Sequence, residues 1–277
     1  MITDLMLRRS LSRMRPVPLP RGEAPFVAVG LDPTAGTLGP GGMRSGDKAM
    51  PSYAIGWDGA AFRPTSDPIS WNHSNDDFWG HVDRAGADVI AIDGPCAVHP
   101  NGPRWIAGRS VWEAGGTGVR AAERELTAGG IHLFWTTRNT VLHFDGASRW
   151  IARSLTLFAE SRLRPRPAET IETHPHGAFV FLWRLLGGEG PPPRKASPAG
   201  RLVRWAILRA FIEQLPETPP ASHDEIDALC AALVAGLHRL GLTVAFGSPA
   251  EGGEIWMPDV RQLSVLDFEG RLAVDDG

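Results

Sequence analysis

Five acidic residues stand at positions where their carboxylates can act together. Asp32 directly follows the apolar run FVAVGL, and Asp93 ends the run VIAID. Glu172 lies in a third run, ETIET, while Asp224 and Asp227 lie in the stretch SHDEIDALCAAL. Ligands of open α/β sheets bind at the carboxyl ends of the strands. Carboxylates at such an edge are the oxygen ligands that hard divalent cations prefer.

Asp224 and Asp227 are three residues apart, so on a helix they project as neighbours from one face. Acids in a first helical turn favour the positive end of the helix dipole, and this accounts well for Asp224. It accounts poorly for Asp227, which lies further along among apolar and small residues. Because an acid on a packed face is costly unless it is paired or bound to metal, a structural and a functional role both stay open. Asp93 has a structural alternative too, since aspartate is common in turns.

A helix is predicted to carry Asp224 and Asp227. Ser222, followed three residues later by Glu225, predicts a capping box at its start. Apolar residues then recur at helical spacing and form one stripe: Ile226, Leu229, Cys230, Leu233, Val234, Leu237 and Leu240. The other side carries small residues, Ala228, Ala231 and Ala235, which allow the helix to lie close to a neighbour.

The rest of the chain alternates strands with helices, which predicts an α/β fold with a mixed sheet. Strands are expected at 26–31, 52–57, 60–63, 88–93, 131–136, 168–174, 243–246 and 254–256, with one more edge strand from 260. Helices are expected at 75–85, 119–128, 147–162, 175–186 and 201–215, and a loop at 96–117. Residues 1–24 are rich in arginine and proline and are expected to form a basic, flexible arm.

The composition limits which functions are possible. The formal net charge of -3 gives no overall basic footprint, so a nucleic-acid contact requires a local patch. Candidates for phosphate binding are Arg164, Arg166, Lys195 and Arg204, which flank the acids in sequence. The alternative is that each of these residues simply lies on a solvated face of the protein and binds no phosphate. Two cysteines in apolar segments indicate a reducing, cytoplasmic compartment, and no apolar run approaches the roughly 20 residues that span a bilayer.

The acids on three strands and a late helix resemble those of the ribonuclease H-like superfamily, and the Asp-x-x-Asp helix resembles that of Holliday-junction resolvases. More closely, the sequence is similar to the bacterial family labelled domain of unknown function 429, predicted ribonuclease H-like nucleases. The matching motifs are VGLD at 29–32, AIDGP at 91–95, IETHP at 171–175 and HDEIDALCAA at 223–232. The resemblance covers about residues 26–257 and implies that 25–277 form one ribonuclease H-like domain.

This resemblance implies a metal-dependent nuclease that hydrolyses phosphodiester bonds of DNA or RNA with Mg²⁺ or Mn²⁺. Two ions roughly 3.5–4 Å apart would stabilise the attacking and leaving oxygens. Asp32 would bridge the ions, Asp93 and Asp227 would flank it, and Glu172 and Asp224 would be outer ligands or orient water.

Two histidines are further candidates: His174 or His223 would steer the water or the leaving group, although a loop histidine without a role is the alternative for each. One departure concerns Gly108–Ser110, where related chains tend to carry an arginine-rich motif followed by an acid. Arg120 and Glu123 are candidates to stand in for that motif.

A non-catalytic alternative stays open. The same fold can serve as a nucleic-acid or protein-binding module. The mildly acidic net charge favours such a module or a small phosphorylated substrate, whereas the acids favour the nuclease.

Overall fold

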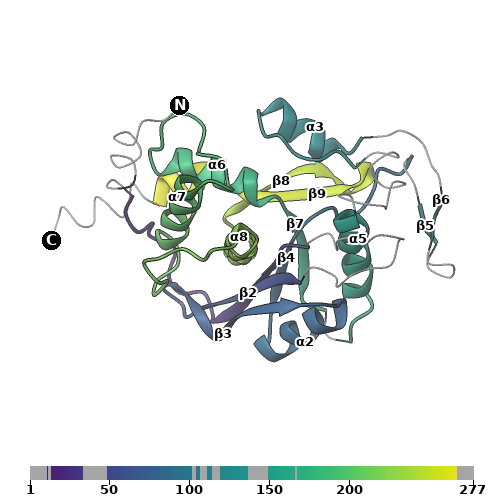
Figure 1. Ribbon diagram of the computed structural model, residues 1–277, viewed down its shortest axis with the longest axis horizontal. Helices are drawn as coiled ribbons and strands as arrows, with labels where there is room; N and C mark the ends of the chain where they lie inside the picture. The colour runs from purple at the N-terminus through teal and green to yellow at the C-terminus, as the bar shows by residue number, and fades with distance from the viewer. Residues whose placement is uncertain are drawn as a thin grey trace.

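The computed structural model describes residues 11, 14–33, 49–101, 104–106, 111–113, 119–136, 149–165 and 167–266 (Figure 1). Its elements in chain order are β1 (Phe26–Leu31), β2 (Met50–Trp57), β3 (Phe62–Asn72), α2 (Asn75–Ala85), β4 (Val89–Asp93), β5 (Arg104–Ile106), β6 (Val111–Glu113), α3 (Ala121–Ala128), α5 (Arg149–Ser161), β7 (Glu169–Thr173), α6 (Pro175–Leu185), α7 (Pro198–Arg209), α8 (His223–Arg239), β8 (Thr243–Ser248), the short 3-10 helix η2 (Pro249–Glu251) and β9 (Gly253–Pro258).

Seven strands form one mixed sheet in the order β3-β2-β1-β4-β7-β9-β8. Strands β1, β4, β7 and β9 run parallel to one another. The hairpin partners β2, β3 and β8 run antiparallel to their neighbours. The expected α/β fold with a mixed sheet is therefore confirmed, including the parallel pairing of the two strands that lead to Asp32 and Asp93.

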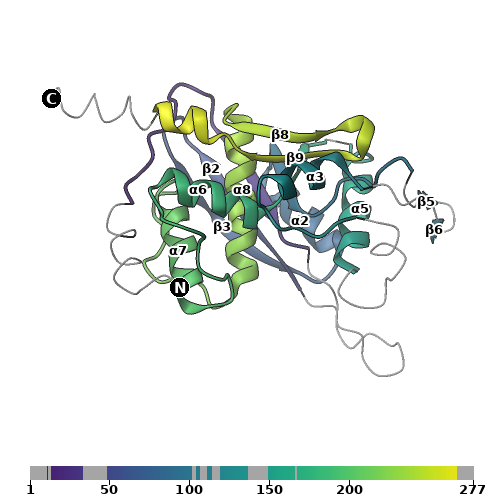
Figure 2. The same ribbon diagram turned by 90° about the horizontal axis from the view of Figure 1, so that it is seen from above.

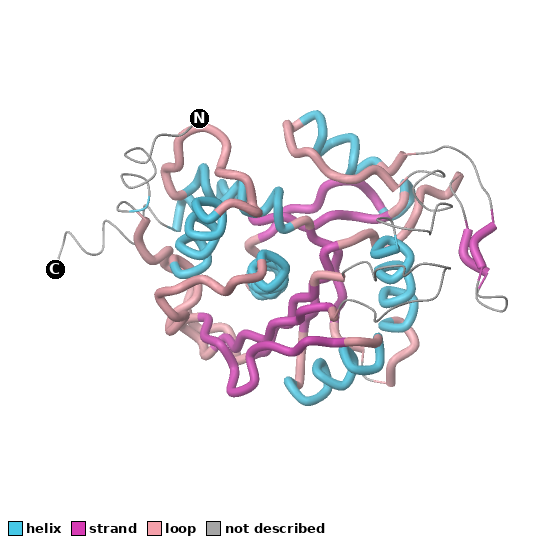
Figure 3. Tube along the Cα trace, viewed as in Figure 1, coloured by secondary structure: helices cyan, strands magenta, loops and turns pink. Residues whose placement is uncertain are grey.

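Helices cover both faces of this sheet, as Figures 1 and 3 show. Ala28 and Ala91 belong to the core under α6, α7 and α8. Val29 and Ile90 belong to a second core with residues of α2 and α5. Because successive strand residues point to opposite faces, strands buried on both sides read as continuous apolar runs, which is why β1 and β4 stand out in the sequence.

Helix α8 lies across the middle of the sheet, between the strands and helices α6 and α7 (Figure 2). Its small residues Ala228, Ala231 and Ala235 are completely buried, as expected for a close-packed face. The closest approach is at Gly30 of β1. A Cβ atom there would lie 2.0 Å from the Ala232 nitrogen and 2.2 Å from the Ala228 oxygen. Only glycine therefore fits under α8 at this point of the strand.

Strand register decides which acids share a face. Asp93 lies beside Thr173 on β7, and Ile92 lies beside Glu172. Since alternate residues point to opposite faces, Glu172 projects away from the face of Asp93. Asp32 follows Leu31, which is the register partner of Ile92, so Asp32 and Asp93 come next to each other at the carboxyl edge.

Two expected strands are wrong because their backbone groups bond elsewhere. Residues 131–136 have no regular structure, and the Thr136 N–H donates to the Glu123 carboxylate instead of to a strand. Residues 260–266 are helical, with Asp259 accepting from the Arg261 N–H at the start. That interaction is a helix cap, which the sequence pattern alone did not distinguish from an edge strand.

Three smaller details also differ. Ser222 does cap α8, but its hydroxyl accepts from the Asp224 N–H, so the expected box with Glu225 is not the bond that forms. Helix α7 begins at Pro198, since Ser197 caps it and proline suits the first helical turn. Residues 104–106 and 111–113, expected to be loop, pair as β5 and β6.

The described part of the N-terminal segment, residues 14–24, runs without regular structure along the core. Val17 is buried there, and its N–H donates to the Ala210 oxygen just after α7 at 2.8 Å. Residues 1–10, which hold Arg8 and Arg9 of the expected basic arm, lie outside the described residues.

Gly30→Ala tests the close approach of α8 to the sheet. The added methyl group overlaps the α8 backbone, so we expect a loss of about 3 kcal/mol in the free energy of unfolding, the upper end of overpacking effects. Gly56→Ala on β2 is the matched control, because its Cβ would meet nothing within 4 Å. The control should be unchanged or gain up to about 1 kcal/mol. Equal urea midpoints for both variants would contradict the packing described above.

Candidate metal centre

Asp32, Asp93 and Asp227 converge on one point at the carboxyl edge of the sheet. One carboxylate oxygen from each lies within 4.8 Å of the others. Asp32 follows β1, Asp93 ends β4, and Asp227 comes from the second turn of α8. The expectation that these three carboxylates come together is confirmed, and it follows from the adjacent strand ends and the close seating of α8 at Gly30.

Asp227 is held by two cations. The Lys195 ammonium donates to Oδ2 at 2.9 Å, and the Arg204 guanidinium donates to Oδ1 at 3.1 Å. Asp227 and Arg204 are each only 1% exposed. The Arg204 guanidinium also stacks over the Phe179 ring, 4.6 Å from its centroid. These contacts hold the Asp227 carboxylate in a fixed, buried position, unlike an ion pair on a solvated surface.

A histidine completes this support. His176 Nδ1 lies 3.0 Å from Arg204 Nη2. Burial, followed by the Arg204 charge, lowers the pKa of His176 to about 4. The imidazole is therefore neutral at pH 7 and accepts a hydrogen bond from the guanidinium.

Asp32 is in the opposite electrostatic situation. Burial raises the pKa of its carboxyl well above the ordinary value of 3.8, and the neighbouring Asp93, Asp227 and Asp224 raise it further. Lys195 acts in the other direction but does not cancel these effects. Burial alone would lower the pKa of Lys195, but the Asp227, Asp32 and Asp93 charges leave it raised. The anionic form of Asp32 is therefore disfavoured at this centre, and a nearby cation or a proton would stabilise the carboxyl.

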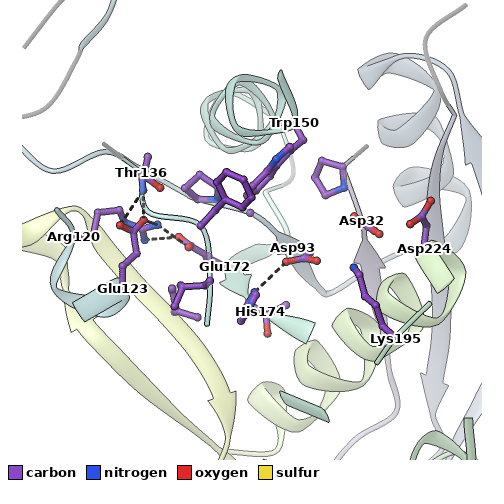
Figure 4. A pocket seen from close by; sticks show the side chains of 17 residues that line it. Asp32, Asp93, Arg120, Glu123, Thr136, Trp150, Glu172, His174, Lys195 and Asp224 are labelled. Carbon is purple, nitrogen blue, oxygen red and sulfur yellow. Dashed lines mark hydrogen bonds and ion pairs between the residues drawn. The ribbon is translucent and has the colours of Figure 1, made fainter. Parts of the chain in front are cut away.

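Asp224 lines the same cavity and is largely buried. Its Oδ1 lies 3.1 Å from Nε2 of His223. On the other side, His174 Nδ1 lies 3.8 Å from Asp93 Oδ1 (Figure 4). Of the two histidines singled out in the sequence, His174 therefore stands next to a carboxylate of the cluster, and His223 stands next to Asp224.

Glu172 belongs to a second cluster in the same cavity (Figure 4). Arg120 donates to its two carboxylate oxygens at 2.7 and 2.6 Å, and the Cys96 N–H donates at 2.7 Å. Glu123 lies beside Arg120, and burial raises its pKa even though Arg120 opposes the shift. Arg120, one of the two candidates to stand in for the arginine-rich motif, thus binds Glu172, and Glu123 lies beside Arg120. Glu172 is not brought together with Asp32, Asp93 and Asp227, because the strand register turns it to the other face of the sheet.

The four expected phosphate-binding residues are placed differently from one another. Lys195 lines the cavity with its side chain 44% exposed. Arg204 is buried and its guanidinium is bonded to Asp227, so it does not stand on an exposed surface where a phosphate could bind. Arg164 pairs with Asp83 and stacks on Trp79. It precedes β7 and so lies at the opposite, amino edge of the parallel strands, away from the acids that it flanks in sequence. Arg166 lies outside the described residues.

The cavity that contains both clusters has a volume of about 410 Å³. Sequence reasoning missed its aromatic wall, made by Phe134 and Trp150. Trp150 falls in a correctly predicted helix, but no residue spacing indicates which way it points. Phe134 falls in the segment wrongly expected to be a strand, where a phenylalanine is unremarkable.

These features define a mixed α/β protein with a carboxylate cluster at the carboxyl edge of its parallel strands. The chain belongs to the family described as protein of unknown function (DUF429), whose model matches residues 53–251. The matched segment includes Asp93, Asp224 and Asp227 but begins after Asp32. No curated protein and no solved structure matched the chain. Among the described residues, no helix is long and apolar enough to cross a membrane.

Asp32→Asn tests the repulsion within the cluster. Because the pKa of Asp32 is raised on folding, its stability contribution is fully present below the unfolded pKa and is lost as pH rises through the folded one. The metal-free variant should therefore unfold at higher urea than wild type at pH 7, and this advantage should disappear towards pH 4. An advantage that does not change with pH would show that the carboxyl is not destabilised.

Asp227→Asn should have the opposite sign at pH 7. The amide keeps the shape but removes the charge that balances buried Arg204. Since hydrogen bonds to charged groups contribute about 1.5–3 kcal/mol, we expect a loss of about 2 kcal/mol in the free energy of unfolding without metal. A variant as stable as wild type would argue against the ion pairs described here.

Proposed function

We propose that this protein is a divalent-metal-dependent nuclease with a ribonuclease H-like fold, which hydrolyses phosphodiester bonds of DNA or RNA. The observation that carries the proposal is the convergence of Asp32, Asp93 and Asp227 within 4.8 Å at the carboxyl edge of the sheet. Acids at two central strand ends and on a late helix support the superfamily resemblance, which also implied an acid on a third strand, Glu172.

The donor set fits Mg²⁺ or Mn²⁺. It consists of carboxylate oxygens without cysteine, and this is the ligand chemistry that suits these ions. Mg²⁺–oxygen distances are about 2.0–2.1 Å, so ligands on opposite sides of one ion lie roughly 4 Å apart, which is similar to the spacing of the three oxygens within 4.8 Å of one another. A cation beside Asp32 and Asp93 would also offset the repulsion that raises the pKa of Asp32. When bound, such ions polarise a phosphoryl oxygen and lower the pKa of a bound water.

The remaining residues of the centre have separate tasks. Arg204 and Lys195 hold Asp227 in place, and they reduce the repulsion that a third carboxylate adds. Because Lys195 is 44% exposed and lines the cavity, its ammonium is also the described cation best placed to meet a substrate phosphate. His174, beside Asp93, lines the cavity and stands where a proton can be exchanged with water there. His223 does not line the cavity and contacts it only through Asp224.

One observation favours a non-catalytic binding module as a second candidate. Lys195 already neutralises part of the cluster through its 2.9 Å bond to Asp227. In a module that binds no metal, this lysine would be the permanent counter-charge. The two candidates differ in their response to metal, so metal titration separates them.

Melting curves with increasing Mn²⁺ test the metal binding that the proposed nuclease requires. An ion that binds only the folded state adds about 2.7 kcal/mol at a hundredfold excess over Kd, so the wild type should melt progressively higher. Asp93→Asn should respond much less because it removes a ligand. Asp83→Asn is the matched control, since Asp83 pairs with Arg164 at the other edge of the sheet, and it should respond like wild type.

The same three proteins should then be incubated with single-stranded DNA, duplex DNA, RNA, an RNA–DNA hybrid and a four-way junction. We expect Mn²⁺-dependent cleavage of at least one substrate by wild type and Asp83→Asn, and a loss of at least about a hundredfold for Asp93→Asn, in line with removal of one group that stabilises the transition state. Nucleic-acid binding without cleavage, together with a melting temperature indifferent to Mn²⁺, would favour the binding module instead.

A further inference from the structure

The cavity has an aromatic wall beside the carboxylates. Trp150 reaches into it from α5 (Figure 4), and Phe134 lines it from the segment after α3. The two rings lie edge to face, with centroids 6.0 Å apart and an interplanar angle of 87°. Phe134 is 56% exposed, although phenylalanine is among the residues that are most often fully buried.

The aromatic wall directly adjoins the candidate metal centre. Gly94 follows Asp93, and a Cβ atom on Gly94 would lie 3.3 Å from Cζ3 of the Trp150 ring. It would also lie 2.7 Å from the Ser154 hydroxyl oxygen, one turn further along α5. The indole therefore packs on the backbone next to a carboxylate of the cluster. A ligand that reaches both features would place a flat ring close to the group that is held at the carboxylates.

The size of the cavity limits what can reach both features. A volume of about 410 Å³ is that of a small-molecule site. Bases inside a duplex are stacked and paired, and a protein reaches one in a pocket only when the nucleotide is extruded or the strand is single. Aromatic side chains bind such exposed bases by stacking, whatever their sequence.

We propose that Phe134 and Trp150 form a nucleobase-binding subsite, so that the protein acts on a nucleoside phosphate unit whose base is unstacked. This inference rests on the proposed function, which identifies the anionic end of the ligand as a phosphate at the carboxylate cluster. The shared chemistry is a base, a sugar and a phosphate. Its source is a single-stranded nucleic acid or a free nucleotide.

Paired probes with and without the base test the subsite. For the strand, a fluorescein-labelled thymidine decamer is compared with a decamer of the same length made of abasic sites, by anisotropy in Ca²⁺ buffer. For the free nucleotide, thymidine 5′-monophosphate is compared with deoxyribose 5-phosphate as competitors. Each pair keeps the phosphates and removes only the base. In wild type, base removal should weaken binding about 5- to 150-fold, which corresponds to ~1–3 kcal/mol for a stacked base.

Three variants test whether Phe134 and Trp150 are the source of the preference for probes that carry a base. Phe134→Ala and Trp150→Ala should bring the ratio of the two affinities close to one while leaving the affinity of the base-free probe unchanged. Phe134→Ala changes an exposed side chain, so it stays informative if Trp150→Ala does not fold. Trp135→Ala is the matched control, because the Trp135 indole donates to Thr127 of α3 and is absent from the cavity lining. It should keep the wild-type ratio.

The two proposals fail separately. A wild-type ratio near one in both probe pairs, or a ratio that survives both cavity substitutions, overturns the subsite even if Mn²⁺ still raises the melting temperature. If the ratio of the two affinities depends on Phe134 and Trp150 but Mn²⁺ does not change the melting temperature, the subsite is supported and the nuclease proposal is contradicted. A preference confined to the monophosphate pair identifies a free nucleotide, and one confined to the decamers identifies a strand.

Discussion

The centre depends on the contact between α8 and β1. Gly30 lets the α8 backbone approach so closely that a Cβ atom would overlap the Ala232 nitrogen at 2.0 Å. Asp32 stands two residues beyond Gly30 on the strand, and Asp227 stands one helical turn before Ala231. The approach that buries the small face of α8 therefore also sets Asp227 against the strand-end acids. Any larger residue at Gly30 would separate the carboxylates as it loosened the core.

Charge is distributed unevenly across the cavity. Asp227 is matched by Lys195 and Arg204, and Glu172 by Arg120, so each of these acids is fixed by ion pairs. Burial raises the pKa of Asp32, and repulsion from the neighbouring acids raises it further. Acids in such ion pairs keep their side chains in fixed positions, whereas an acid that its neighbours repel marks a place where a cation or a proton is needed. The aromatic wall beside Asp93 then supplies an uncharged surface next to this charged one.

The sequence predicted the parts whose signals are local. Continuous apolar runs identified β1 and β4, and Pro175 marked the start of α6. Strand-end positions identified Asp32 and Asp93, and the stretch rich in alanine identified the face that α8 buries. Other properties depend on tertiary placement. The face to which Glu172 points is set by register with Ile92, the burial of Arg204 is set by the packing of α7 on α8, and the edge on which Arg164 lies is set by strand direction. Trp150 and Phe134 gave no signal, because a helical tryptophan and a loop phenylalanine fit any core.

A crystal structure from crystals soaked in Mn²⁺, with anomalous scattering recorded at the manganese edge, tests the central claim most directly. The account predicts an anomalous peak about 2 Å from carboxylate oxygens of Asp32, Asp93 and Asp227, with Arg204 still bonded to Asp227. No peak at this position, with Lys195 still bonded to Asp227 and the three carboxylates unchanged, would show that the cluster is neutralised by the chain itself and would contradict the account.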